Sequence, residues 1–587
     1  MKNRFKFSYS LVLGLGLSMG LSSCADWLDL EPENSVTAEN YWMNESDVSS
    51  AMTGIYCKWL GASSDMWVQS EMRADMITVG YSTNTNYTLV REGNITSTNS
   101  LVSWANYYNI INSCNLLLER SHLALENDPA YTVTQDSIYH AEARVVRAMM
   151  YFYLIRLWKD VPYITTAYYD DTHDRNVSVS KQMTILNAII ADLEAVQSEG
   201  ILPYSYSSAS SDKALNKGQV TMYMLKALLA DMYRMKGSYS TDPAESQEAY
   251  QKCVDLCNTI IESGQYALVP FSKSTAVDSN ITLTDCTEHA DSCFYNLSDV
   301  SSEDWFTQVY SKGNSNESIM ELQEDSYNSS AFYGKVVGTR YYIPNVDNLT
   351  MSVFPSTEKE VAMLYGYRDG RRAFCYGTIS GNTVIAKNAF TDFTTAITAE
   401  TDYKKNVLVY RLAEIYLMKA EALTQIAMAS NNDPDMLLEA YRAVFKVRDR
   451  ASAVETTDLQ ISSGEYMQDV YWDELRNEQP ISLKRGDISA SSLEKFILDE
   501  EAREMMFEGR RWFDVLRNAE RNSEGSGSCT GGSISYLLSI AGSCTETDKV
   551  SYITGQFRKA DFRYLPYPYN DVSVNDALEQ KPFWGVE

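Results

Sequence analysis

Apolar residues recur at three- and four-residue spacing between Ser137 and Trp158, a pattern that predicts a helix. Its first apolar face comprises Ile138, Ala141, Val145, Ala148, Phe152 and Ile155. A second stripe lies beside it, and a helix that is apolar over so much of its circumference is expected to be buried between neighbours. Asp136 or Ser137 is expected to cap its start, and Pro162 to end it, because a residue before proline disfavours helix. This stretch is therefore predicted to be the central core helix.

The same spacing predicts further helices, some of them in pairs with short connections. The expected helices cover residues 47–60, 104–120, 219–236, 246–263, 409–424 and 437–450. Within the last two pairs, small residues stand where the helices are expected to cross. This arrangement is typical of tetratricopeptide-like packing, although the spacing is too irregular for a tandem array. The predicted fold class is mainly α, built from tetratricopeptide-like helix pairs.

Other parts of the chain are polar and show weak periodicity. Residues 67–103, 270–400, 451–490 and 518–550 are rich in Ser, Thr and Asn, and residues 270–400 are also rich in Tyr. Such composition predicts loops, short turns and a few short strands. The helical scaffold is expected to cover roughly residues 46–270 and 400–450, interrupted and followed by a loop-rich, irregular region.

The chain begins with a targeting segment. Three basic residues within the first six precede an apolar run over residues 11–20, which is shorter than the roughly 20 residues of a membrane span. Small residues Ser22 and Ser23 then precede Cys24. The L-S-S-C segment reads as a lipobox, with Cys24 as the lipidation site, residues 1–23 removed and residues 24–45 as the acylated tether. The alternative is an ordinary signal peptide with an incidental cysteine.

Charge and cysteine content narrow the function classes. The 587 residues carry a formal net charge of −28, which repels phosphate backbones, so no nucleic-acid partner is expected. No C-x-x-C motif occurs and the four histidines are scattered, so neither a metal site nor a cofactor is expected. The spacings of Cys286 with Cys293 and of Cys529 with Cys544 suit loop disulfides. The cysteines expected to be small core residues are Cys114, Cys253 and Cys257.

Several segments, in order along the chain, resemble the SusD/RagB family of outer-membrane nutrient-binding lipoproteins. They are C-A-D-W-L-D-L-E-P, D-V-S-S-A-M-T-G-I-Y, E-A-R-V-V-R-A-M-M-Y-F-Y-L-I-R-L-W-K-D-V-P-Y-I, G-Q-V-T-M-Y-M-L-K-A-L-L-A-D-M-Y, V-Y-R-L-A-E-I-Y-L-M-K-A-E-A-L, E-M-M-F-E-G-R-R-W-F-D-V-L-R and R-Y-L-P-Y-P-Y-N-D-V-S-V-N. Each match is weak alone, but together they cover almost the whole chain after Cys24.

The resemblance implies one SusD-like domain over residues 46–587, with the ligand surface on loops of roughly 270–400 and 451–587. It implies a cell-surface, lipid-anchored protein of the outer membrane that captures oligosaccharide. It also implies a partner, a SusC-like TonB-dependent barrel transporter over which the protein sits as a lid. The membrane is then contacted only through the lipid anchor. A peptide ligand is the alternative within the family, and a purely structural surface protein would bind neither.

An enzymatic alternative, glycoside hydrolysis, rests on acids around Glu504. Asp499, Glu500 and Glu501 share its helix, whereas the reaction needs two carboxylates on opposite sides of the scissile bond. Such a helix face is expected to be solvated or paired with Arg503, Arg510 and Arg511, so no catalytic residue and no enzyme activity is predicted. The family usually carries arginines where Glu501 and Ala502 stand, which puts a local ion-pair network in doubt. The acids Asp170, Asp171 and Asp174 lack the glycine and terminal glutamate of a calcium-binding EF-hand loop.

The remaining candidate chemistry is aromatic side chains in polar stretches. Sugar C–H faces pack on Trp and Tyr rings, while neighbouring polar groups bind the hydroxyls. Trp305 stands in a polar stretch with no helical periodicity to demand its burial, so it is expected to be exposed. The candidate ligand-binding residues are Trp67, Arg73, Tyr81, Trp305, Tyr310, Tyr341 and Tyr342.

Overall fold

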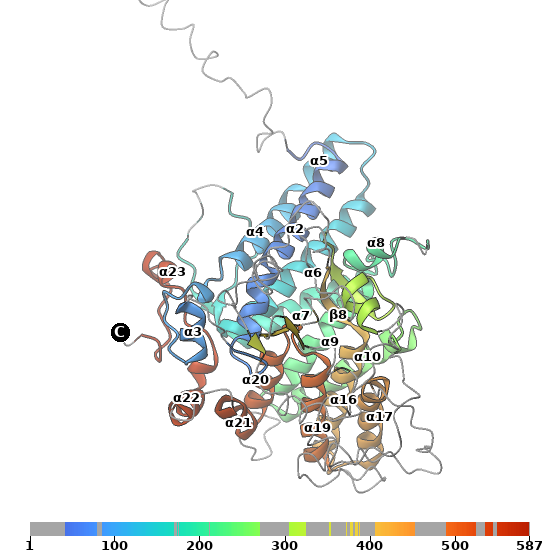
Figure 1. Ribbon diagram of the computed structural model, residues 1–587. Coiled ribbons are helices and arrows are strands. Elements are labelled where there is room, and N and C mark those ends of the chain that lie inside the picture. The colour runs from blue at the N-terminus through green and yellow to red at the C-terminus, as the bar shows by residue number, and fades with distance from the viewer. Residues whose placement is uncertain are drawn as a thin grey trace, which may run out of the picture.

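Figure 1 shows the computed structural model, in which helices dominate. The residues that the structure describes are 41–78, 85–169, 173, 175–209, 212–270, 305–324, 352–353, 371, 376–379, 382–385, 387, 405–451, 489–523, 534–543 and 549–585. The mainly helical fold class predicted from the sequence is confirmed.

The first half of the chain supplies a run of helices. Its elements are α2 (Glu45–Glu71), β1 (Ile77–Thr78), α3 (Thr85–Arg91), η1 (Ser100–Val102), α4 (Ala105–Arg120), α5 (His122–Asn127), α6 (Val133–Trp158), β2 (Val161–Pro162), β3 (Val179–Ser180), α7 (Gln182–Glu199), α8 (Lys213–Gly218), α9 (Met222–Tyr239) and α10 (Pro243–Glu262).

The second half adds short strands and a further group of helices. Its elements are η4 (Thr307–Lys312), β4 (Ser318–Leu322), β5 (Ser352–Val353), β6 (Tyr376–Ile379), β7 (Asn382–Ile385), β8 (Val407–Arg411), α16 (Leu412–Ala429), α17 (Pro434–Arg450), α19 (Ala490–Glu504), α20 (Arg511–Arg521), α21 (Ser535–Ser543), α22 (Val550–Phe557), η8 (Ala560–Arg563) and α23 (Tyr569–Val574). The strands form two-stranded antiparallel pairs, β1 with β5, β2 with β3, β4 with β8 and β6 with β7.

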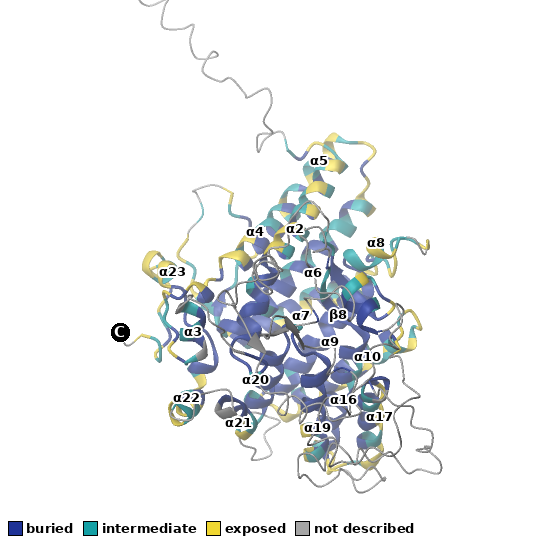
Figure 2. Ribbon diagram, in the orientation of Figure 1, coloured by how far each residue is buried: buried dark blue, intermediate teal, exposed yellow. Residues whose placement is uncertain are grey.

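Helix α6 is the buried central helix that the sequence predicts, and Figure 2 shows its buried residues within the core. Its start differs from the prediction. The N-cap is Thr132, whose hydroxyl accepts a hydrogen bond from Gln135 N, while Gln135 Oε1 accepts one from Thr132 N at 2.9 Å. This reciprocal capping box satisfies two backbone donors at once, so Asp136 and Ser137 lie inside the helix and do not cap it.

Consecutive helices pack side by side, as the predicted pairs require. Helix α9 packs on α10, α10 on α16, and α16 on α17. Gly237 allows the first of these contacts, because a Cβ atom at this position would come within 2.8 Å of the Tyr250 ring. Contacts of α2 with α4, α4 with α6 and α6 with α7 extend the series toward the N-terminus.

Some stretches predicted as loops are helical. Helix α2 runs to Glu71, well past the expected end at residue 60, and α3 and η1 lie within residues 67–103. Helix α7 was not predicted, and α21 lies within residues 518–550. The weak periodicity misled the prediction for α2, because its second half buries Ser63, Ser64 and Ser70 beside Trp and Met, so small polar residues share the buried face.

The acids of α19 are buried and ion-paired, so of the two predicted outcomes, a solvated face or pairing with arginines, the second is confirmed. Glu500 and Glu504 are both fully buried and share Arg371, whose Nη1 lies 2.7 Å from the first and 2.6 Å from the second carboxylate. Glu501 binds Arg234 of α9 at 3.0 Å. An extensive ion-pair network therefore exists despite the substituted arginines, and it joins α9, α16, α19 and α20 through further pairs on Glu421.

The expected partners of these acids are only partly right. Arg503 does pair with Glu500, at 2.8 Å. Arg510 instead pairs with Glu414, and Arg511 with Asp75 of the segment after α2. The arginines of the turn and helix that follow α19 therefore reach across to other elements.

Three of the cysteines behave as predicted: Cys114, Cys253 and Cys257 are buried in the core. The cysteines proposed for loop disulfides, Cys24, and the acids Asp170, Asp171 and Asp174 lie outside the described residues. Within the part of the chain that the structure describes, no helix is long and apolar enough to cross a membrane. No group of three or more His, Cys, Asp or Glu side chains in that part could hold a metal ion.

Candidate functional site

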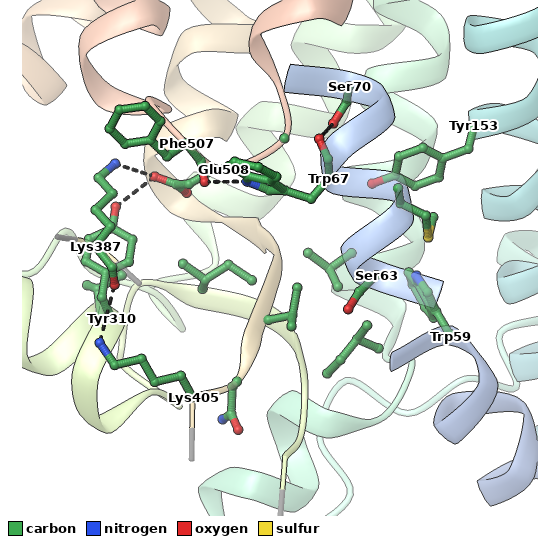
Figure 3. Close-up of a pocket in the computed structure, with 18 residues that line it drawn as sticks. Trp59, Ser63, Trp67, Ser70, Tyr153, Tyr310, Lys387, Lys405, Phe507 and Glu508 are labelled. Carbon is green, nitrogen blue, oxygen red and sulfur yellow. Dashed lines mark hydrogen bonds and ion pairs between the residues drawn. The ribbon is translucent and has the colours of Figure 1, made fainter. Parts of the chain in front are cut away.

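A recess opens between the second half of α2, the β4–β8 pair and the turn that joins α19 to α20, and Figure 3 shows it. Aromatic side chains from four parts of the chain line it, and charged side chains stand at one side. The residues that line it include Trp59, Ser63, Trp67, Ser70, Tyr310, Lys387, Lys405, Glu508 and Gly509.

One helical face of α2 supplies a wall of the recess. Trp59, Ser63, Trp67 and Ser70 follow at spacings of four, four and three residues, which place them on the same side of the helix. Asn44 begins the helix with a capping box, in which its side chain accepts from Asp47 N and the Asp47 carboxylate accepts from Asn44 N at 3.1 Å. The alternation of indole and hydroxyl gives this wall both apolar area and hydrogen-bonding groups.

The turn after α19 forms a second wall, which meets α2 at Ser70 and Glu71. Phe507 and Gly509 have positive φ angles of 65° and 75°, so the chain reverses within a few residues. A Cβ atom at Gly509 would lie 3.2 Å from Ser70 Oγ, so the absence of a side chain lets the turn press against α2. The turn is tied there by Gly509 N, which donates to Glu71 Oε1 at 2.7 Å.

Charged groups converge on Glu508 at one side of the recess. Its carboxylate accepts from Lys387 Nζ, Tyr310 Oη and Arg411 Nη2, each at 2.8 Å. Burial alone would raise the pKa of Glu508, but the charges of Arg411 and Lys387 outweigh it and lower the pKa to about 2. Glu508 is therefore an anion at neutral pH that holds a lysine and a tyrosine in place.

Lys405 is a second lysine of the recess. Its ammonium group donates to the carbonyl oxygen of Lys387 at 3.4 Å. Burial lowers the pKa of Lys405 to about 7, because a charged ammonium loses its hydration there. The recess thus offers a fixed ammonium at Lys387 and, at Lys405, one whose charge changes near neutral pH.

The structure brings together two of the predicted ligand-binding residues, Trp67 and Tyr310, although they are far apart in the sequence. Both are largely buried, with exposed fractions of 4% and 8%, so they border the recess and form no open platform. Tyr81, Tyr341 and Tyr342 lie outside the described residues.

The expectation that Trp305 is exposed was wrong. Its side chain is fully buried, and its ring packs edge-on against Tyr310 with centroids 5.0 Å apart. Lys387 and Arg450 also lie over the Trp305 ring, at 5.6 and 5.2 Å from its centroid. Trp305 therefore packs behind Tyr310 and Lys387, two residues that line the recess. Its contacts with the cations Lys387 and Arg450 stabilise the ring in this buried position, although its neighbours in the sequence are polar.

Arg73 also lies in the interior, away from the recess. Its guanidinium packs over the Trp512 ring at 4.4 Å and donates to backbone carbonyls of Phe562 and Arg563. Arg73 thus holds the C-terminal segment onto the core, which is a structural task and differs from the ligand contact that was predicted for it.

Five residues that line the recess were not predicted from the sequence: Trp59, Ser63, Lys387, Lys405 and Glu508. A signal existed for the first two, since the helical spacing from Trp59 to Ser70 continues beyond the predicted end of the helix. The charged residues had no signal, because only the folded chain brings Lys387 to the turn that contains Glu508.

The size of the recess limits what it can hold. Its empty volume is about 780 Å³ including the open mouth, but the centre of a water molecule fits into only about 70 Å³ of it. At roughly 10–15 Å³ for each water, this is room for a few waters or for one sugar ring. The recess can therefore take one end or one unit of a longer ligand.

The fold is a helical scaffold with a small recess that is lined by aromatic and charged side chains. Two family descriptions match the chain, "SusD family" over residues 298–584 and "Starch-binding associating with outer membrane" over residues 26–221. The chain belongs to the SusD/RagB family, as its sequence motifs predict. Proteins of this family bind ligands and are not enzymes, and membership implies association with the outer membrane.

Individual relatives agree with this assignment. The chain is 23% identical to the SusD-like protein P38 of Formosa agariphila over 536 residues, which cover 87% of this chain and 90% of the relative. Among solved structures, a SusD superfamily protein of Bacteroides vulgatus matches with a TM-score of 0.62 and 16% identity, covering 93% of this chain and all of that one. Surface glycan-binding protein A of Bacteroides uniformis matches with a TM-score of 0.61 and 18% identity, covering 92% and 99%.

Proposed function

We propose that the protein is a cell-surface lipoprotein that captures an oligosaccharide and passes it to a SusC-like TonB-dependent transporter. The family description names starch binding and the outer membrane, and one structural neighbour is a surface glycan-binding protein. In this proposal residues 1–23 are removed, Cys24 carries the lipid, and residues 24–45 tether a single domain to the membrane.

The observation that carries the proposal is the recess in which Trp67 and Tyr310 meet. A sugar ring that enters it removes apolar area of its C–H face from water against the aromatic side chains, at roughly 25 cal/mol per Å². Its hydroxyls meet the ammonium of Lys387 and the amide of Asn406. Each such polar contact replaces a hydrogen bond with water and contributes only about 1 kcal/mol.

Weak affinity follows from the small contact. Association costs several kcal/mol of lost translational and rotational freedom, so one buried unit gives micromolar or poorer affinity, a binding free energy on the order of −8 kcal/mol or weaker. Such binding suits a protein that must release its ligand to a transporter. A ligand longer than one unit then lies mostly outside the recess.

The test is calorimetry of the purified protein with a panel of oligosaccharides and peptides, followed by the Ser63→Leu variant. Ser63 faces the recess and its hydroxyl donates only to the Leu60 carbonyl, so a leucine fills the space without removing a partner of another element. The affinity of the best glycan is expected to fall about tenfold or more, at a packing cost of about 1–3 kcal/mol.

Ser198→Leu is the matched control, since Ser198 donates to the carbonyl three residues before it in α7 and is exposed. It should bind like the wild type. If the wild type binds peptides and no glycan, the ligand class is wrong. If Ser63→Leu folds and binds glycan as the wild type does, the glycan lies elsewhere.

A further inference from the structure

A second cavity lies between the first half of α2, the start of α6 and the segment before α9. The centre of a water molecule fits into about 210 Å³ of it, which is room for more than a dozen waters at roughly 10–15 Å³ each. It is lined by Ser49, Met52, Thr53 and Tyr56 of α2, Gln135, Ile138, Tyr139 and Glu142 of α6, and by Tyr206 and Gln219. The recess described above uses the other half of α2, so the two sites are distinct.

A ring of hydrogen bonds encloses Glu142, whose side chain lines this cavity although the residue is 2% exposed. Val220 N donates to Tyr56 Oη at 2.9 Å, and Tyr56 Oη donates to Glu142 Oε2 at 2.6 Å. Tyr206 Oη lies 2.7 Å from the Val220 carbonyl oxygen and 3.0 Å from Glu142 Oε1.

Both oxygens of Glu142 accept hydrogen bonds from tyrosine hydroxyls. The Val220 carbonyl only accepts, so the single hydroxyl proton of Tyr206 is shared between that carbonyl oxygen and Glu142 Oε1. The carboxyl group is therefore held in place by two neutral donors.

The surroundings of Glu142 raise the pKa of its carboxyl group. Burial raises the pKa of Glu142 to about 7, although the hydrogen bonds from Tyr56 and Tyr206 act in the opposite direction. Among the described residues that line the cavity, none is Lys, Arg or His. The carboxyl group thus has no cation among the residues that line the cavity, and near pH 7 it exchanges between its protonated and ionised forms.

We propose that this cavity binds a primary ammonium group, which replaces the proton on Glu142. The ammonium donates hydrogen bonds to the carboxylate, the Glu142 proton leaves to solvent, and the hydroxyls of Tyr56 and Tyr206 keep donating to the carboxylate. Tyrosine rings attract cations that lie over their faces, and Tyr56, Tyr139 and Tyr206 all line the cavity. The side-chain amides of Gln135 and Gln219 can bind the remainder of the ligand.

The ligand class is a small amine, either a free alkylamine or an amino sugar. The net charge of −28 concentrates such cations near the protein. The inference does not rest on the proposed glycan function, since it uses other residues and another part of α2.

Binding that displaces a proton depends on pH. The groups facing Glu142 are Tyr56 of α2, Tyr206 before α8 and Tyr139 on its own helix. Burial raises the pKa of Tyr139, and the charges of Glu45 and Glu142 raise it further. These tyrosines stay neutral at physiological pH because burial raises each pKa above 10. Affinity should therefore weaken about tenfold for each pH unit below 7 and level off above it.

The test is calorimetry of the full chain without its leader. The probes are n-butylammonium and glucosamine, with n-butanol and glucose as neutral counterparts, at pH 7.5 and pH 6. Saturable binding of n-butylammonium with proton release, measured in two buffers of different ionisation enthalpy, is expected. Glucosamine binding in addition, without glucose binding, would identify the amino sugar as the source.

Glu142→Gln keeps hydrogen-bonding groups for both tyrosines and removes the negative charge, so amine binding should fall at least about tenfold. Glu248→Gln, a charge loss at an exposed position of α10, is the control and should leave binding unchanged. Thr53→Trp narrows the cavity from an exposed position and should weaken binding without disturbing the Glu142 ring. The proposal is overturned if neither amine binds, if the neutral counterparts bind equally, or if Glu142→Gln binds within twofold of the wild type.

Discussion

The indole N–H of Trp67 donates a hydrogen bond of 2.8 Å to the carbonyl oxygen of Phe507, which lies 440 residues further along the chain (Figure 3). Phe507 has a φ of 65°, a conformation that is costly for a residue with a Cβ atom. The bond therefore holds a strained turn against α2 and fixes the distance between the two walls of the recess.

Replacing Trp67 by Phe should test this tie, because the substitution keeps a ring and removes the N–H. The buried Phe507 carbonyl loses its donor, which should lower the free energy of unfolding by about 1–3 kcal/mol. Trp584→Phe is the control: its indole donates to the Asp561 carbonyl at 3.3 Å in a half-buried position, so water can replace it. Urea unfolding measures both, and equal losses would show that the Trp67 bond carries no special weight.

Removing Arg411 should be more damaging. Its guanidinium lies 2.7 Å from Glu317, 2.5 Å from Glu504 and 2.8 Å from Glu508, all of them buried. In Arg411→Met these carboxylates lose a shared cation, so unfolding free energy should fall by about 3–5 kcal/mol. The comparison is Arg144→Met, whose pairs are nearer the surface and should contribute about 1 kcal/mol or less. A loss no larger than this control would show that the network is dispensable.

Acid should weaken the fold through Glu508. Its pKa is lowered from the ordinary 4.5 to about 2, so the folded state gains stability above pH 4.5 and loses it as pH falls toward 2. The loss amounts to about 3 kcal/mol over that range. In Glu508→Gln, unfolding free energy measured from pH 6 to pH 2.5 should be lower at neutral pH and should fall less steeply on acidification. An unchanged acid slope would mean that Glu508 does not carry this linkage.

Glu71 should have the opposite effect on the pH dependence of stability, because it should make the folded state less stable as pH rises. Burial is the main cause that raises its pKa from 4.5 to about 8, and its Oε2 atom has no hydrogen-bond partner among the described residues. A raised pKa gives stability that is complete below pH 4.5 and is lost as pH rises through 8. Glu71→Gln keeps an acceptor for Gly509 N and cannot ionise, so it should be more stable than the wild type at pH 8, by a few kcal/mol. Equal stability at pH 8 would contradict the prediction.

The lipid anchor is tested at Cys24. Cys24→Ala removes the residue that we propose carries the lipid, so the protein should leave the membrane fraction when it is expressed without the proposed transporter. Immunoblots of soluble and membrane fractions measure this, with Cys57→Ala as a control because Cys57 is an exposed thiol far from the lipobox. Membrane retention of Cys24→Ala would show that another feature anchors the protein.

Trp305 and the acids of α19 show where sequence reasoning stops. Polar neighbours suggested an exposed Trp305, yet Lys387 and Arg450 enclose its ring from distant parts of the chain. Acids on one helix suggested a face that is solvated or paired with nearby arginines, yet Glu504 meets cations that lie 54 to 133 residues away. Burial of a charge depends on partners that only the fold supplies, so no local pattern reveals it.

The sequence by itself determined the core helix α6, the helix pairs around α9 and α16, and the family. These follow from the spacing of apolar residues and from short motifs, both of which act within a few turns of the chain. Only the tertiary structure decided the recess beside Trp67 and the cavity beside Glu142. Trp67 with Phe507, and Glu142 with Tyr206, meet because separate helices pack together, and that packing sets both the distance between them and the pKa of the buried carboxyl groups.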